Sequence, residues 1–380
     1  MEVYLDYGAT SYKKPAVVFE AMSSFFNNNN TNPGRGGYQL AVEAGQCVFQ
    51  ARANILKFFN GSLEDQVIFT KNVTEALNIV IKGLANKSDH FLISSIEHNS
   101  VYRTIDYLAQ IGLITYDIVA VLPSGEFSFE SLENKKRNNT KAFILNHASN
   151  VSGHIMPIND IGKYCRENNI LLVVDGAQSA GILPVDFQNQ PMDVFCFTGH
   201  KHLMGPMGTG GFLIKKSLGE SIPPLIHGGT GSLSENALMP GFLPDHFEAG
   251  TVNAVGIAGL GAAVEYLLEK SILQLEGKEK DLHNRLYKGL LDSVPNIHFY
   301  GNMAVPKIGV MSFNIENVDN GEFADYLDEY FQIMARSGLH CSPLAHETFS
   351  DLRGSIRFSV GHYTTDEEVD YVLNCFDSLF

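Results

Sequence analysis

The sequence is poor in positive charge. Of its 380 residues, 27 are Lys or Arg and 42 are Asp or Glu, so the formal net charge is −15. Nucleic-acid binding needs a basic face that neutralises phosphates, and docking on anionic lipid needs basic residues as well. The acidic balance therefore argues against a nucleic-acid partner and against a membrane surface. It would suit a partner protein that carries a basic patch.

Cysteines and long apolar runs are also scarce. The five cysteines include no C-x-x-C pair, and their odd number fits neither a disulfide framework nor a zinc site, so no metal is expected. No apolar run reaches the roughly 20 residues of a membrane-spanning helix, and the start MEVYLDYGAT lacks secretory-signal features. We therefore expect a cytoplasmic globular α/β protein of two or three domains, most simply an enzyme that acts on small molecules.

Apolar strands alternate with helices over most of the chain. Strands that are apolar throughout and separated by helices indicate a mostly parallel sheet with helices on both faces. The polar tract 27–30 is predicted to begin a loop. Strands are expected at 66–70, 91–95, 141–146, 170–175, 194–198 and 211–215, and helices at 40–59, 74–84, from about 100, and at 158–168.

The pattern changes near Gly259. A helical stretch over 261–294, with one break, leads to shorter strands at 308–314 and 355–361 with a helix between them. A last helix should begin at Thr365, where T-D-E-E matches a capping box. We predict an N-terminal segment 1–12 that packs on the small domain or on a partner, a large domain 13–258 and a smaller α+β domain 259–380.

Loops that follow the apolar strands hold the candidate chemistry, because ligands of such sheets bind beyond the carboxyl ends of the strands. Asn72 is expected to cap a helix with Glu75 reciprocating, and that helix start is either an ordinary turn or an anion site. His98 follows a strand at a helix entry, where it is either a structural histidine or a ring or proton carrier over a ligand.

Asp175 and Lys201 each come at the end of an apolar strand. Asp175 ends ILLVVD and either caps a helix or meets a cationic ligand group, and Gln178 follows it. An apolar wall would desolvate the Lys201 amine and make it a better nucleophile toward carbonyls. No Walker loop is present, and no G-x-G-x-x-G follows a strand. The set matches what pyridoxal phosphate requires, with Lys for a Schiff base and Asp to keep the pyridine nitrogen protonated.

An ordered series of segments runs nearly end to end along the chain. They are YLDYGATS (4–11), NPGRGG (32–37), FTKNVTEALN (69–78), EHNS (97–100), HASNVSG (147–153), VDGAQ (174–178), FTGHK (197–201), FEAGTVN (247–253), RSGLHC (336–341) and IRFS (356–359). In these segments the chain resembles the class V aminotransferase family of pyridoxal-phosphate enzymes, in its group II cysteine desulfurase and selenocysteine lyase branch. The resemblance implies the type I aminotransferase fold and a homodimer with its sites at the subunit interface.

The resemblance also implies a role for each matching residue. Lys201 would bind the cofactor covalently, Asp175 would pair with its pyridine nitrogen, and His98 would stack on its ring and handle protons. Gln178 would lie near the ring hydroxyl, and Asn150 would lie near the cofactor hydroxyl and the substrate. The phosphate would be bound by Thr74, Thr198 and His200, together with Thr251 of the partner subunit. Arg357 would bind the substrate carboxylate, and Arg336 would lie near the reacting sulfur.

Cys341 is the most informative match. In R-S-G-L-H-C it takes the position of the persulfide-forming nucleophile of group II desulfurases. Its neighbours are polar and flexible, and nearby Arg336 and His340 would favour the thiolate. Buried cysteines usually act as small hydrophobic residues, and that interpretation is expected for Cys47, Cys165, Cys196 and Cys375.

The implied activity is conversion of L-cysteine to L-alanine, with the sulfur passing to Cys341 and from there to an acceptor protein. Selenocysteine lyase, a class V aminotransferase of a small amino acid, and a regulator that binds the cofactor without turnover are the alternatives. Several positions depart from the family pattern and point to a subgroup apart from the housekeeping iron–sulfur enzymes. These departures are Tyr7, Gly8, Tyr38, Ser342 and the tail PLAHETF.

Overall fold

A seven-stranded sheet forms the centre of the molecule in a computed structural model that describes residues 1–34, 36–349 and 352–380. Strand β8 runs antiparallel to both of its neighbours, and the other strand pairs are parallel, so the predicted mostly parallel sheet is confirmed. Arg35 of the NPGRGG segment lies outside the described residues. In spatial order the strands are β2 (Asp65–Thr70), β8 (Gly210–Lys215), β7 (Val194–Thr198), β6 (Leu171–Asp175), β5 (Thr140–Asn146), β3 (Asp89–Ser94) and β4 (Ile114–Val119).

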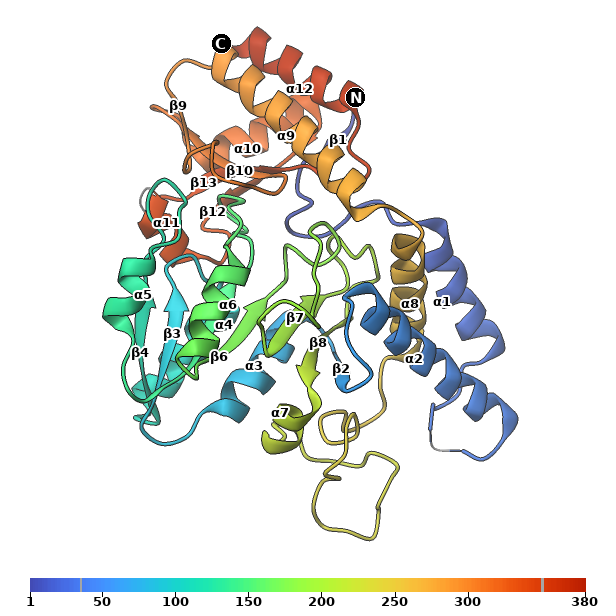
Figure 1. Cartoon of the computed structure of the whole chain (residues 1–380). Helices are drawn as coiled ribbons and strands as arrows, with labels where there is room; N and C mark the ends of the chain where they lie inside the picture. Colours follow the sequence, from blue (N-terminus) through green and yellow to red (C-terminus); the bar gives the residue numbers. More distant parts are fainter. Residues whose placement is uncertain (35, 350–351) are drawn as a thin grey trace.

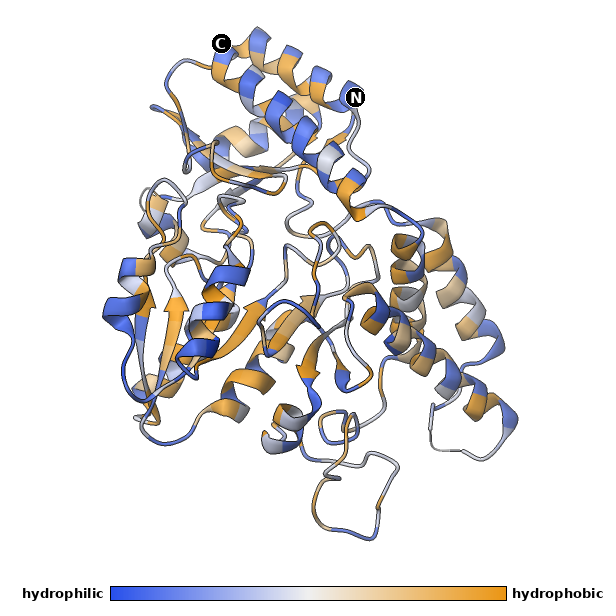
Figure 2. Ribbon diagram, in the orientation of Figure 1, coloured by the Kyte–Doolittle hydropathy of each residue, from blue (hydrophilic) through white to orange (hydrophobic). Residues whose placement is uncertain are grey.

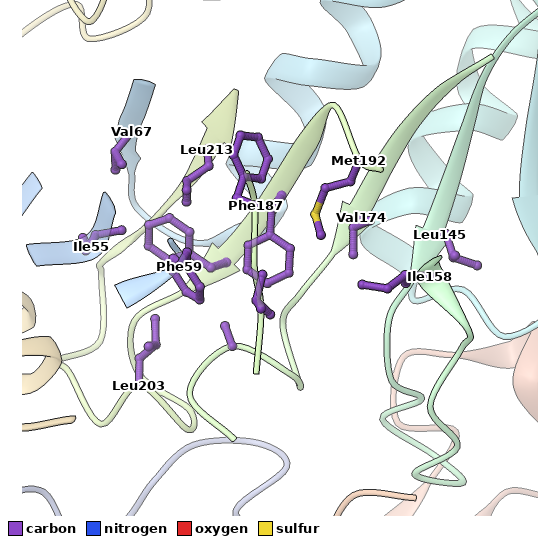
Figure 3. Packing of buried hydrophobic residues seen from close by; sticks show 14 of the residues in the cluster. Ile55, Phe59, Val67, Leu145, Ile158, Val174, Phe187, Met192, Leu203 and Leu213 are labelled. Carbon is purple, nitrogen blue, oxygen red and sulfur yellow. The ribbon is translucent and has the colours of Figure 1, made fainter. Parts of the chain in front are cut away.

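Both faces of this sheet are covered, as the apolar strands predict. Along β5, Ala142 and Ile144 belong to a core with α3 and α4, whereas Phe143 and Leu145 belong to a second core on the other face. Figure 3 shows part of this second core, where Phe59 and Phe187 pack beside the sheet. The helices of this part are α1 (Ala16–Asn28), α2 (Gln39–Phe58), α3 (Val73–Leu84), α4 (Asn99–Gln110), α5 (Phe129–Lys135), α6 (Ile158–Glu167), α7 (Lys216–Ser221) and α8 (Ala254–Leu268).

The C-terminal part has a smaller antiparallel sheet and its own core. In Figure 1 it lies beyond one end of the large sheet, with both chain termini on it. The predicted break in the long helical stretch falls between α8 and α9, and Thr365 caps α12 in a capping box. The elements are β9 (Ile297–Phe299), β10 (Val310–Ile315), β12 (Arg336–Gly338), β13 (Ser355–Ser359), α9 (Ile272–Ser293), α10 (Asn320–Phe331), α11 (Pro343–Phe349) and α12 (Asp366–Leu379).

The N-terminal segment joins this C-terminal part. Strand β1 (Val3–Tyr4) pairs in parallel with β11 (Ile333–Met334), and Asp6 forms a bridge with Ser359. The segment therefore begins on the C-terminal part, and it then reaches the large sheet, where Thr10 Oγ1 donates to the carbonyl oxygen of His200 after β7 at 3.1 Å. The predicted division of the chain between 258 and 259 stays a prediction.

Two local predictions need correction. The polar tract 27–30 does not begin as a loop, because α1 continues through Asn28. Asn72 caps α3 as predicted, but the Glu75 carboxylate accepts from the Lys71 N–H at 2.7 Å and not from the cap residue itself. Figure 2 shows apolar colour concentrated on the central strands. Among the described helices, none combines the length and the apolar character that crossing a membrane requires.

Candidate active site

Asp175 and Lys201 meet at the carboxyl end of the central strands. Asp175 is the last residue of β6, its carboxylate accepts from the Ala177 N–H at 2.9 Å, and its burial raises its pKa. Lys201 follows β7, and desolvation lowers the pKa of its amine to about 8, although the charge of Asp175 opposes the shift. At a pKa of about 8, roughly a tenth of the amine is uncharged at pH 7, and the uncharged state is the one that attacks carbonyl carbon.

His98 lies beside this pair as the N-cap of α4. The Ser100 N–H donates to His98 Nδ1 at 3.0 Å, so the neutral ring carries its proton on Nε2. Burial is the main cause that lowers the pKa of His98 to about 4, and the positive charge of Lys201 acts in the same direction. At neutral pH the ring is thus uncharged and presents an N–H donor.

The segment YLDYGATS (4–11) forms hydrogen bonds with residues that follow strands β6 and β7. The sequence analysis did not assign this role to the segment. Gln178 Nε2 donates to the Gly8 carbonyl oxygen at 2.9 Å. His200 Nδ1 lies 3.0 Å from Thr10 Oγ1, and the His200 carbonyl accepts from the Ser11 N–H at 2.9 Å. The N-terminal segment therefore forms one wall of the site.

Asp6 holds the two arginines that were assigned to the substrate. Its carboxylate accepts from Arg357 Nη2 at 2.6 Å and from Arg336 Nη2 at 2.8 Å. A Cβ atom on Gly8 would lie 3.2 Å from Arg357 Cζ, so the absence of a side chain lets this backbone lie against the guanidinium. The departure at Gly8 thus has a packing reason, and Asp6 is a site residue that the sequence analysis missed.

Asp6→Asn is expected to lower the free energy of unfolding by about 3 kcal/mol, because it leaves the Arg357 charge buried without a carboxylate. The side chain of Arg357 is 3% exposed and that of Asp6 is 14% exposed. Urea unfolding measures the loss. The matched control is Asp370→Asn, which removes the 52% exposed partner of Arg285 and should cost less than about 1 kcal/mol. Equal losses in the two variants would contradict the assigned pairing.

Cys341 is exposed in the turn between β12 and α11, whereas Cys165, Cys196 and Cys375 are buried and Cys47 is partly buried. Its carbonyl oxygen accepts from the Asn99 N–H at 2.8 Å. Since Asn99 follows the cap residue of α4, this bond places the Cys341 turn directly against the loop of His98. Burial raises the pKa of the Cys165 thiol to about 12, which suits an inert structural cysteine.

The other predicted residues divide into two groups. Asn150 is buried, and its backbone carbonyl contacts Arg357. Thr198 is buried at the end of β7. Thr74 is exposed in the first turn of α3, and Thr251 accepts from Asn32 Nδ2 at 3.4 Å in a hollow shared with Lys71. Lys201 lines a different, narrow hollow. The hollow of Thr251 includes Thr70 at the end of β2 but not Lys201, Asp175 or His98.

Unpaired buried polar atoms test whether pyridoxal phosphate fits here. Among the described residues, Gln178 Oε1, Thr198 Oγ1 and Arg357 Nε are buried without a hydrogen-bond partner. Buried polar atoms are normally satisfied, so these atoms fit a polar ligand between the strand ends and the arginines. The desolvated Asp175 carboxylate fits a cationic ring nitrogen, and the residues present therefore fit this cofactor. The described residues include no cluster of His, Cys, Asp and Glu able to hold a metal ion.

Comparison with known proteins identifies the family. The model of the family described as "Aminotransferase class-V" matches residues 3–372. The chain belongs to the class-V aminotransferases. This confirms the resemblance drawn from the motifs.

Individual members of the family show similarity over almost the whole chain. The chain is 33% identical to a "Probable cysteine desulfurase" of Methanothermobacter thermautotrophicus over 374 residues, which covers 97% of this chain and 92% of that protein. It is 32% identical to a "Cysteine desulfurase" of Escherichia coli O7:K1 over 378 residues, covering 97% and 90%. The solved apo structure of the cysteine desulfurase from Thermococcus onnurineus NA1 matches with a TM-score of 0.92 at 29% identity, covering 100% of this chain and 94% of that one. The predicted type I fold is thereby confirmed.

Proposed function

We propose that this family member is a pyridoxal-phosphate-dependent cysteine desulfurase. L-Cysteine would become L-alanine, and its sulfur would leave as a persulfide on Cys341. The Cβ–Sγ bond of the substrate breaks as the Cys341 sulfur forms an S–S bond to Sγ. The electron pair of the broken bond stays on carbon, and one proton takes the place of the sulfur on Cβ. The observation that carries the proposal is the position of the exposed Cys341, which is bonded through its carbonyl to the residue after His98.

The strand ends supply the groups that would hold the cofactor. Lys201 would bind it covalently, Asp175 would pair with its ring nitrogen, and His98 would lie on the ring. Gln178 would hydrogen-bond near the ring hydroxyl, where its Oε1 has no other partner, while Thr198, His200 and Thr74 would bind the phosphate. When bound, pyridoxal phosphate supplies an electron sink that stabilises negative charge at the substrate α-carbon.

Each residue around the substrate has a distinct task in this proposal. Arg357 would bind the substrate carboxylate through donors that include the unpartnered Nε. The uncharged amine of Lys201 would remove the α-proton, which its lowered pKa favours. His98 would donate from Nε2, and the Cys341 thiolate would attack the substrate sulfur with Arg336 close by.

A homodimer and a sulfur acceptor complete the proposal. Because Thr251 and Lys201 line different hollows of one chain, the phosphate would receive Thr251 of the partner subunit. Cys341 is exposed, so an acceptor protein could take up its sulfur without a rearrangement of the core. The acidic net charge of −15 suits an acceptor with a basic patch.

The purified protein, loaded with pyridoxal phosphate and given L-cysteine, is expected to form alanine and Cys341-bound sulfur in equal amounts in the first turnover. Amino-acid analysis measures the alanine, and intact-protein mass spectrometry measures the added sulfur. The exposed thiol favours this outcome over transamination. A keto acid together with an aminated cofactor would overturn the proposal in favour of an aminotransferase.

A further inference from the structure

The turn that carries Cys341 has an unusual backbone. His340 and Cys341 both have positive φ values, 49° and 57°. Residues other than glycine rarely adopt this left-handed region, and two in succession persist only where the surroundings hold them. The contacts of this turn therefore matter for the position of the thiol.

Asn99 and Asn150, which come from other parts of the chain, hold the turn. Asn99 N–H donates to the Cys341 carbonyl at 2.8 Å, and Asn150 Nδ2 donates to the His340 carbonyl at 2.7 Å. Ser342 Oγ in turn donates to Asn150 Oδ1 at 2.7 Å. Ser342 is fully buried and Asn150 is 6% exposed, so solvent does not replace a lost bond easily.

Ser342 fixes the orientation of the Asn150 amide. With Oδ1 accepting from Ser342, the amide must point Nδ2 at the His340 carbonyl, and the two bonds clamp the turn on both sides of Cys341. The backbone carbonyl of the same Asn150 accepts from Arg357 Nη1 at 3.0 Å. This clamp therefore ties the Cys341 turn to the arginine that is proposed to bind the substrate carboxylate.

We propose that Ser342 is a positioning residue for sulfur transfer, because its hydroxyl, acting through Asn150, holds the Cys341 thiol at a fixed place relative to the bound substrate. The inference rests on the proposed desulfurase function and adds a residue to it. Transfer between two sulfur atoms requires close approach in a set direction, and a displacement of about 1 Å can cost about 100-fold in rate. The Arg357 contact uses a backbone oxygen, so loss of the hydroxyl should spare substrate binding.

Ser342→Ala is expected to lower kcat for alanine formation from L-cysteine about 10-fold, with KM unchanged within about 2-fold. Hydrogen exchange of the apoprotein should show faster exchange for Asn99 and for residues 339–342, because the clamp has opened. The control is Ser378→Ala, which removes a hydroxyl that donates to the Cys375 carbonyl at 2.7 Å in α12, outside this turn and its clamp. That control should leave both the kcat and the exchange of the turn as in the wild type.

Several outcomes would overturn the positioning role. It fails if Ser342→Ala keeps the kcat of the control, if only KM rises, or if exchange in the turn stays unchanged. If the unaltered protein makes no alanine from L-cysteine, the proposed function itself fails and this role with it. The exchange measurement on the apoprotein then still decides separately whether the Ser342 hydroxyl holds the turn.

Discussion

Lys201→Ala is expected to lower the rate of alanine formation from L-cysteine by about 10⁴-fold, even with saturating pyridoxal phosphate. The substitution removes the covalent anchor of the cofactor and the base for the α-proton together. The amine of Lys201 suits both tasks because burial lowers its pKa to about 8. Steady-state alanine assays measure the loss, and the visible spectrum shows whether the cofactor still binds.

Lys14→Ala is the matched control for this prediction. Burial also lowers the pKa of the Lys14 amine to about 8, but that amine donates to Ser11 Oγ at 2.8 Å on the N-terminal segment. We expect its removal to change the rate by no more than a few-fold. A large loss in the Lys14 variant with a small loss in the Lys201 variant would show that the wrong lysine has been assigned.

The large sheet could be predicted from the sequence because its inner strands are apolar throughout. Strand β7 was predicted with its observed bounds, and β5, β6 and β8 within one residue. Edge strand β4 was missed, since its sequence ITYDIV mixes exposed and buried residues. Strands β11 and β12 have two and three residues, which is too short for any periodic pattern.

Within the candidate site, sequence patterns singled out the residues at the ends of strands. They did not single out residues whose hydrogen-bond partners are far away in the sequence. Asp175, Lys201 and His98 each follow an apolar run, so local pattern was enough to single them out. Asp6 pairs with arginines 330 and 351 positions away, and Ser342 reaches Asn150 over 192 positions. No periodicity signals such pairs, although the motif that contains Asp6 was recognised by its resemblance to the family.

Cys341→Ala is expected to lower alanine formation from L-cysteine by at least about 100-fold and to abolish the sulfur adduct on the protein, because the positioned nucleophile is gone. With L-selenocysteine the loss should be much smaller, since selenium leaves carbon more easily than sulfur and needs less help from a thiol. Parallel assays of alanine from the two substrates measure the difference. They also separate a desulfurase from a selenocysteine lyase, in which the variant would keep its main activity.

The control for this last prediction is Cys47→Ala, which removes a partly buried thiol whose pKa is raised by desolvation. Such a thiol holds little thiolate, and its loss should leave both activities near the wild-type level. Cys341 differs because it is exposed and because its turn is bonded to the residue after His98. Full retention of L-cysteine turnover in Cys341→Ala, with an acceptor protein present, would show that Cys341 is not the nucleophile. Lys201, Asp175 and His98 would then be the cofactor-site residues of an aminotransferase.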